Sequence, residues 1–285
     1  MADLFNYDAG ELLIFILVLV RISGIIATAP MLGSNNIPVQ IKAVLILILG
    51  LIIQPFIDFP RVLPNQPSEY VLLIFSELLI GLVMGLVGRF MFAAIEFAGT
   101  VVGFQMGLSM ANMFDPMSQQ QISMLARFET AVAMLVFLVM DLHLVIVQAM
   151  VRSYSLLPPG GAGMSNDLAR EILSLSSSVF AIGLQIGAPL IVALFLSNMI
   201  IGLLARSVPQ IQIFVVGFPL TLLLGFVFLM LGIPFLVMAI RRMFAMLDNQ
   251  LLDMLRVLGL SSVSYTHLRA HETSLHLVCR LLLEK

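Results

Sequence analysis

Long runs of apolar residues limit the folds open to this chain. Charged residues make up only 11% of the sequence, so few of them interrupt these runs. The runs cover residues 12–29, 43–57, 70–87, 90–104, 131–151, 179–205 and 211–240. A membrane-spanning helix needs about 20 apolar residues, so the second and fourth runs are short for simple spans. The last run is longer than one span and contains Pro219 and Pro234, which favour kinks. The runs predict an all-α, polytopic integral membrane protein.

Composition narrows the function classes further. A mean hydropathy of +1.09 and 60% hydrophobic residues are typical of integral membrane proteins. The basic residues are scattered and the net charge is −2, so we expect no nucleic-acid partner. A single cysteine excludes an internal disulfide framework. The first eleven residues contain acidic side chains and no Lys or Arg, so we do not expect a signal peptide there.

The segment 99–121 differs from everything around it. Gly99, Gly103 and Gly107 recur every fourth residue, so on a helix they form a smooth strip that another backbone can approach closely. Asp115-Pro116 then ends the helix, because proline has no N–H and disfavours helical geometry at the residue before it. Lipid does not tolerate such a broken segment, so it must be enclosed by protein or line a watery cavity.

The same segment is rich in methionine and amide side chains. Met106, Met110 and Met113 continue almost the same helical face, and glutamines fill positions 119–121. Methionine is flexible and polarizable, which suits a surface that closes against changing shapes. Two interpretations stay open from composition alone: a pore-closing element, or an ordinary loop between membrane helices with a Met-rich packing face.

Charged residues within or beside the apolar runs are the next signal. They are Glu77, Arg89, Glu96, Arg127, Glu129 and Asp141. Each would cost about 2.5–3.5 kcal/mol at the centre of a lipid-exposed helix, so we expect them to face protein or water. A proton or ion relay and ordinary ion pairing between helices are both possible. We favour ion pairing, because no single segment concentrates the charges.

Two further glycines share a helical face with one of these charges. Gly81 and Gly85 follow Glu77 at four-residue intervals. Gly99 and Gly103, further along the chain, are separated from each other by the same interval. All four are predicted to be helix-packing positions. Neither a nucleophile motif nor a phosphate-cradling glycine pattern is visible in the sequence, so we expect neither an enzyme nor a cofactor site.

Short motifs, taken in order, resemble one family. They are Ile37-Pro38-Val39-Gln40-Ile41-Lys42, Ile80-Gly81 with Gly85, Ala98-Gly99, Gln105-Met106-Gly107-Leu108 with Asp115-Pro116, Asp141-Leu142-His143, Ser153-Tyr154 with Pro158-Pro159-Gly160, Ala205-Arg206-Ser207-Val208-Pro209-Gln210, and Gly217-Phe218-Pro219. Each is weak alone, but their order and spacing to about residue 260 resemble the FliR family of flagellar biosynthetic proteins. That family also includes the equivalent subunit of virulence type III secretion systems. One departure is Asp141-Leu142-His143, where the family more often has Gly-His.

The resemblance implies a subunit of the type III export gate in the bacterial inner membrane, at the flagellar basal body. It implies assembly with FliP and FliQ, contact with FlhB, and passage of unfolded export substrates. It also implies a fold of helical hairpins, P-subunit-like in the N-terminal part and Q-subunit-like in the C-terminal third, from residue 188 to 210. The implied turn at the cytoplasmic mouth contains Arg206, Pro209 and Gln210.

The family's plug loop matches residues 107–121. The residues that the resemblance assigns to the pore plug are Gly107, Met110, Met113, Phe114, Asp115, Pro116, Met117, Gln119, Gln120 and Gln121. A plug of glycine, methionine and amides could yield to a passing chain and close again without a fixed charge that traps cargo.

The C-terminal region divides into an expected helix and a tail. Residues 241–258 are predicted to form an amphipathic end helix that closes a membrane domain of residues 1–258. Residues 263–285 have a different composition, with three of the four histidines and the only cysteine, and we expect them to be a non-native tail. A zinc site at His267, His271, His276 and Cys279 is the alternative that we disfavour, so no metal is expected.

Two other function classes compete with an export gate. One is a small-solute or ion transporter with a discontinuous helix, which an inverted internal repeat around residues 120–130 would favour; none is visible in the sequence. The other is a purely structural assembly subunit with no contact with a pore.

Overall fold

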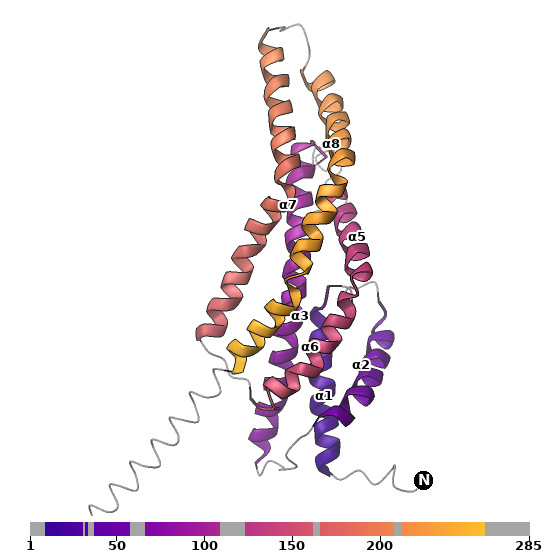
Figure 1. Ribbon diagram of the computed structural model, residues 1–285, viewed down its shortest axis with the longest axis vertical. Helices are drawn as coiled ribbons and strands as arrows, with labels where there is room; N and C mark the ends of the chain where they lie inside the picture. The colour runs from indigo at the N-terminus through magenta and orange to yellow at the C-terminus, as the bar shows by residue number, and fades with distance from the viewer. Residues whose placement is uncertain are drawn as a thin grey trace, which may run out of the picture. The chain divides into compact units, whose positions relative to one another are not determined.

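The structure is a computed structural model that describes residues 9–30, 32–33, 37–57, 66–108, 123–161, 166–207 and 213–259 (Figure 1). Within these residues the regular structure is helical throughout. The elements are α1 (Ala9–Thr28), α2 (Val39–Ile53), η2 (Gln54–Phe56), α3 (Pro67–Gln105), α5 (Met124–Val139), α6 (Leu142–Leu156), α7 (Asn166–Ser207) and α8 (Ile213–Phe244). By length and apolarity, 5 helices could cross a membrane, or up to 6 if the bent α5–α6 pair forms one span. The all-α, polytopic fold is confirmed.

α3 departs from the separate runs predicted at 70–87 and 90–104. It is one continuous helix of 39 residues. Gly88 does not break it, because a glycine in a helix interior costs only about 1 kcal/mol. Arg89 does not break it either, since its side chain is exposed. At about 1.5 Å per residue, α3 is about twice as long as the hydrocarbon core of a bilayer is thick.

The run 131–151, predicted as one segment, is instead divided between α5 and α6. The break lies at Met140 and Asp141, and Asp141 has φ 54, in the left-handed region. Aspartate tolerates this conformation better than most residues, although glycine adopts it without strain. An apolar run cannot reveal such a break, because hydropathy does not report the backbone conformation of one residue.

The chain divides into two compact units. Unit 1 comprises Met1–Arg89, Leu144–Ser174 and Asp248–Lys285, and unit 2 comprises Phe90–His143 and Leu175–Leu247. In unit 1, α1 packs against α2. The buried face of α1 includes Leu17, Ile22, Ile25 and Ile26.

Unit 2 contains the second half of α3, α5, most of α7, and α8. α5 packs against α8. α7 and α8 lie side by side in Figure 1, and the Thr221 hydroxyl of α8 donates to Asn198 Oδ1 of α7 at 3.2 Å. One buried cluster joins these helices through Val102, Met106, Leu125, Leu190, Leu194 and Leu229. A second apolar contact brings together the rings of Phe92, Phe137 and Phe244, in edge-to-face or tilted arrangements with centroid separations of 5.4 to 5.8 Å. Ring separations of this size are favourable for aromatic packing.

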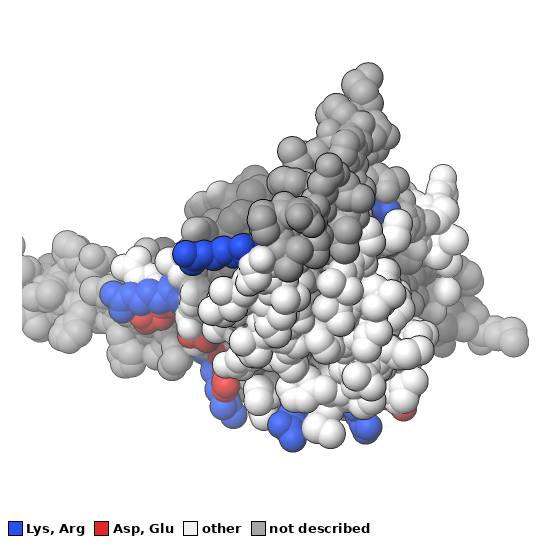
Figure 2. All heavy atoms as spheres, turned by 90° about the horizontal axis from the view of Figure 1, so that it is seen from above, with Lys and Arg blue, Asp and Glu red and all other residues white. Residues whose placement is uncertain are grey.

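Much of the exterior is apolar. Large hydrophobic side chains on α2, α7 and α8 are exposed, among them Leu51, Leu203 and Leu223. Figure 2 shows one face on which charged atoms are confined to the margins of a mainly uncharged surface. A surface of this kind suits lipid or neighbouring membrane subunits rather than water.

The chain continues beyond α8 as a second helix. A turn at 245–246 is followed by helical residues 247–259. Leu251, Met254 and Leu258 are buried there, whereas Asp253 and Arg256 are exposed and form an ion pair with an N···O distance of 3.1 Å.

Candidate functional site

The candidate plug loop is described only at its base. α3 ends at Gln105, a turn carries the chain to Leu108, and α5 begins after Ser123. Of the predicted plug residues, Gly107 is described. Met110, Met113, Phe114, Asp115, Pro116, Met117, Gln119, Gln120 and Gln121 lie outside the described residues. We call the turn 106–108 together with Ser123 the loop base.

Gly99 and Gly103, which precede the loop base on α3, let α3 and the start of α5 approach each other closely. A Cβ placed on Gly99 would lie 2.6 Å from the Cα of Ala126, and one on Gly103 would overlap the hydroxyl of Ser123. The backbone that approaches Gly99 therefore belongs to α5 of the same chain, and Gly103 is approached by the side chain of Ser123, the residue before α5. Both ends of the loop are thereby held close together.

Three buried polar atoms along this contact have no hydrogen-bond partner within the described part of the chain. They are Gln105 Oε1, Ser123 Oγ and Glu129 Oε2. Buried polar atoms are usually paired, so their grouping at one helix contact is unusual. Glu129 is only 1% exposed, which confirms that this carboxyl group faces protein.

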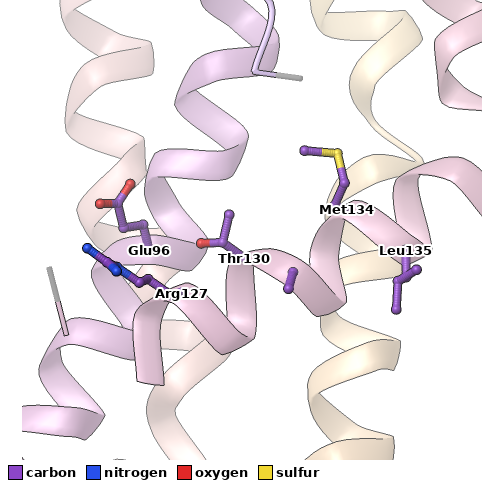
Figure 3. A pocket seen from close by; sticks show the side chains of 6 residues that line it. Glu96, Arg127, Thr130, Met134 and Leu135 are labelled. Carbon is purple, nitrogen blue, oxygen red and sulfur yellow. The ribbon is translucent and has the colours of Figure 1, made fainter. Parts of the chain in front are cut away.

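A shallow pocket lies on the α3–α5 surface of unit 2. Figure 3 shows the carboxylate of Glu96 beside the guanidinium of Arg127 at one end of it. The pocket has a volume of about 560 Å³, and its remaining lining consists of Thr130, Ala131, Met134 and Leu135. Glu96 is half-buried and Arg127 is exposed.

Unit 1 contains a buried ion pair between Arg21 and Glu77, of which the sequence analysis singled out only Glu77. Arg21 of α1 donates to Glu77 of α3 through Nε at 2.7 Å and Nη2 at 3.0 Å. Arg21 also donates to Ser153 Oγ at 2.8 Å and to the carbonyl oxygen of Leu157 at 3.1 Å, and its guanidinium lies 3.9 Å from the ring centroid of Tyr154. Both charged side chains are fully buried.

The pairing of Glu77 confirms the expectation that this charge faces protein and pairs between helices. Arg21 was absent from the charges singled out in the sequence. The signal that could have found it is its position, because it is an arginine inside the first apolar run. An arginine there needs a partner as much as a glutamate does.

The glycines beside this pair mark the crossing of α1 and α3. A Cβ on Gly81 would overlap the carbonyl oxygen of Arg21, and a Cβ on Gly24 would lie 2.9 Å from the backbone nitrogen of Leu82. A Cβ on Gly85 would lie 2.7 Å from the carbonyl oxygen of Ile25. The two helices therefore meet backbone to backbone, which places Arg21 within reach of Glu77.

The remaining predicted positions are less well described. Arg206 lies exposed in the last turn of α7, whereas Pro209 and Gln210 are outside the described residues. The disfavoured zinc ligands in the tail are outside them as well. Among the residues that the structure describes, no three His, Cys, Asp or Glu side chains gather as metal ligands would.

Comparison with known proteins decides the family. Residues 12–247 match the family described as bacterial export proteins, family 1. The chain belongs to this family. The flagellar biosynthetic protein FliR of Escherichia coli (strain K12) is 34% identical over 242 residues, which cover 85% of this chain and 92% of that protein.

Other members of the export family are similar over comparable lengths. FliR of Bacillus subtilis (strain 168) is 31% identical over 250 residues, covering 87% of this chain and 96% of that protein. FliR of Aquifex aeolicus (strain VF5) is 30% identical over 214 residues, covering 75% and 83%. The resemblance seen in the sequence motifs is confirmed, and a small-solute transporter is not favoured.

Proposed function

We propose that this chain is the R subunit of a flagellar type III export gate in the bacterial inner membrane. Its relatives are named flagellar biosynthetic protein FliR, and its own apolar helices suit a multi-pass membrane subunit. It assembles with FliP and FliQ, contacts FlhB, and helps to form the pore through which unfolded proteins leave. The role needs no catalysis by this chain and no cofactor.

Within this gate, residues 107–121 act as the plug. The observation that supports this most directly is the loop base, where Gly99 and Gly103 bring α5 against α3. The two ends of the loop therefore lie close together at the end of α3 and the start of α5. Methionine, glycine and amide residues make up about half of the loop, and Asp115 is its one charged residue, so most of the loop can seal against many side-chain types without fixed charge.

The remaining glycines and the α7–α8 turn have structural roles in this proposal. Gly81, Gly85, Gly99 and Gly103 are helix-packing positions within the chain. Arg206, Pro209 and Gln210 are proposed to lie at the cytoplasmic mouth of the gate.

The plug is tested by replacing residues 109–121 with a short Gly-Ser linker in a gate assembled from this chain and its partner subunits. We expect the membrane to leak small ions, because the pore loses its closing element. Ion flux into cells or vesicles measures the leak, and recovery of the assembled gate is measured in parallel. Membranes that stay ion-tight around a fully assembled gate would remove the plug proposal.

A milder change gives a matched control. Replacing Met110 and Met113 with Gly should produce a smaller leak than the linker does. Met246→Gly is the control, because Met246 is exposed, lies in a turn and is outside the loop. It should leave ion flux unchanged.

A further inference from the structure

We propose that the pocket on the α3–α5 surface is a docking groove for one apolar helix of another subunit of the gate. We call this pocket the α5 groove. Its residues are Glu96 of α3 and Arg127, Thr130, Ala131, Met134 and Leu135 of α5. The inference rests on the export-gate function proposed above. It names the surface of this chain that meets a partner and the chemistry of the partner's helix.

α5 has two faces, and only one of them packs within the chain. The buried face comprises Leu125, Ala126, Glu129, Ala133 and Phe137. The α5 residues of the groove recur at positions i, i+3, i+4, i+7 and i+8, so they share a different face of the helix. Ala131 and Leu135 are exposed on it. α5 therefore presents a second helical face that the core of unit 2 does not use.

The groove has the shape and spacing that suit a single helix. Its volume is about 560 Å³. From Arg127 to Leu135 it follows about two turns of α5, or about 12 Å at 1.5 Å per residue. Side chains at this spacing are the contacts by which one helix lies in the groove of another. The middle residue, Ala131, is small, which allows the backbone of a second helix to approach closely.

The two ends of the groove together exclude water and lipid chains as its occupant. Beyond Leu135 the exposed surface of α5 continues with Leu138 and Val139, so this end favours apolar contact over water. At the other end lie Glu96 and Arg127 (Figure 3), and charged side chains are costly against lipid chains. An apolar helix that carries one polar side chain satisfies both ends.

Glu96 specifies what that polar side chain must be. Its carboxylate is half-buried beside Arg127, yet it has no hydrogen bond or ion pair within the described ranges of the chain. An ionised carboxylate only accepts hydrogen bonds, and bonds to charged acceptors are the stronger ones. The partner helix is therefore expected to place a hydrogen-bond donor, from Lys, Arg, Asn, Ser or Thr, opposite Glu96.

The first test maps what lies against the groove in the assembled gate. A photoreactive amino acid replaces Ala131, and the gate is illuminated after assembly from this chain and its partner subunits. We expect an adduct that mass spectrometry places on a membrane helix of a partner subunit. The same amino acid at Ala245 is the control, because Ala245 is exposed in a turn outside the groove. It should not label that helix.

A second test fills the groove. Ala131→Phe should lower recovery of copurified partner subunits by about tenfold or more, because overpacking a helix contact is unfavourable. Ala245→Phe makes the same change outside the groove and should leave recovery unchanged. Thermal unfolding of the chain alone should not differ between the two variants, since both alanines are exposed.

A third test addresses the hydrogen bond to Glu96. Glu96→Leu removes the acceptor and should lower recovery of the gate by about tenfold or more. Glu96→Gln keeps an acceptor oxygen and should retain most of the recovery. Thr100→Val is the control on the same helix, because the Thr100 hydroxyl donates to the Glu96 backbone carbonyl oxygen within α3. It should assemble as the unchanged chain does.

The outcomes separate this inference from the proposed function. If the unchanged chain copurifies with no gate subunit, the proposed function is wrong. If it does assemble, but the probe at Ala131 labels only phospholipid or a second copy of this chain, the groove is not a site for a partner helix. Recovery of Ala131→Phe equal to that of Ala245→Phe also overturns the inference. So does a loss of recovery that follows a loss of thermal stability, since the residues are then structural only.

Discussion

At the scale of single residues, Arg21 and Glu77 show how a charge is accommodated in a membrane helix. The desolvation of two buried ions is offset only when geometry and hydrogen bonding are both good. Here the guanidinium donates to both carboxylate oxygens, to Ser153 and to the Leu157 carbonyl oxygen. Its face is covered by the Tyr154 ring. The pair thereby joins α1 and α3 to the end of α6.

We predict that Arg21→Met destabilises the protein by about 3–5 kcal/mol, because it leaves the Glu77 carboxylate buried without its partner. Thermal unfolding in detergent, followed by size-exclusion recovery, measures the loss. Arg152→Met is the control, since Arg152 pairs with Asp248 at 3.7 Å and both are about half exposed. Its cost should be about 0–1 kcal/mol. Equal stability of the two variants would contradict the structural role of the buried pair.

At the scale of elements, glycine spacing predicted close approach but not the neighbour. The four-residue interval of Gly99 and Gly103 marks a smooth helical face, and the structure brings α5 of the same chain to it. Periodicity alone could not choose between α5 and a partner subunit, because both would meet the same face. The division of α5 from α6 was missed for a different reason, since it depends on the backbone of Asp141.

We predict opposite effects for one substitution at two glycines of unit 2. Glycine to alanine normally stabilises a helix interior by about 1 kcal/mol. Gly202→Ala should follow this rule, because no described atom lies within 4 Å of the added Cβ. Gly99→Ala should instead destabilise by about 1–3 kcal/mol, as the added Cβ meets the Ala126 backbone. Thermal unfolding of both variants measures the difference, and stabilisation by Gly99→Ala would refute the close contact.

At the scale of the whole molecule, hydropathy predicted most of the fold. Apolar runs are sufficient to indicate membrane helices, since lipid demands satisfied backbone hydrogen bonds. The contacts around the candidate site could not be predicted from the sequence in the same way. Asn198 of α7 donates a hydrogen bond to the carbonyl oxygen of Gln105 at the end of α3, and Met106 packs at Gly225 of α8. Asn198 and Gly225 lie about a hundred positions away in sequence. Such long-range contacts leave no local pattern to read.

The last prediction concerns residues 263–285, which we propose are a non-native tail without a role in export. The family match ends at residue 247, and the tail differs in composition from the rest, holding three of the four histidines and the only cysteine. A stop codon after Ser262 should therefore leave gate assembly and secretion unchanged, as measured by copurification of partner subunits and by exported protein. A stop codon after Arg242 is the contrasting control, because it removes the buried Leu251, Met254 and Leu258 and should abolish assembly. Loss of export after the first truncation, or stoichiometric zinc bound by the full chain but not by the truncated one, would show that the tail is functional.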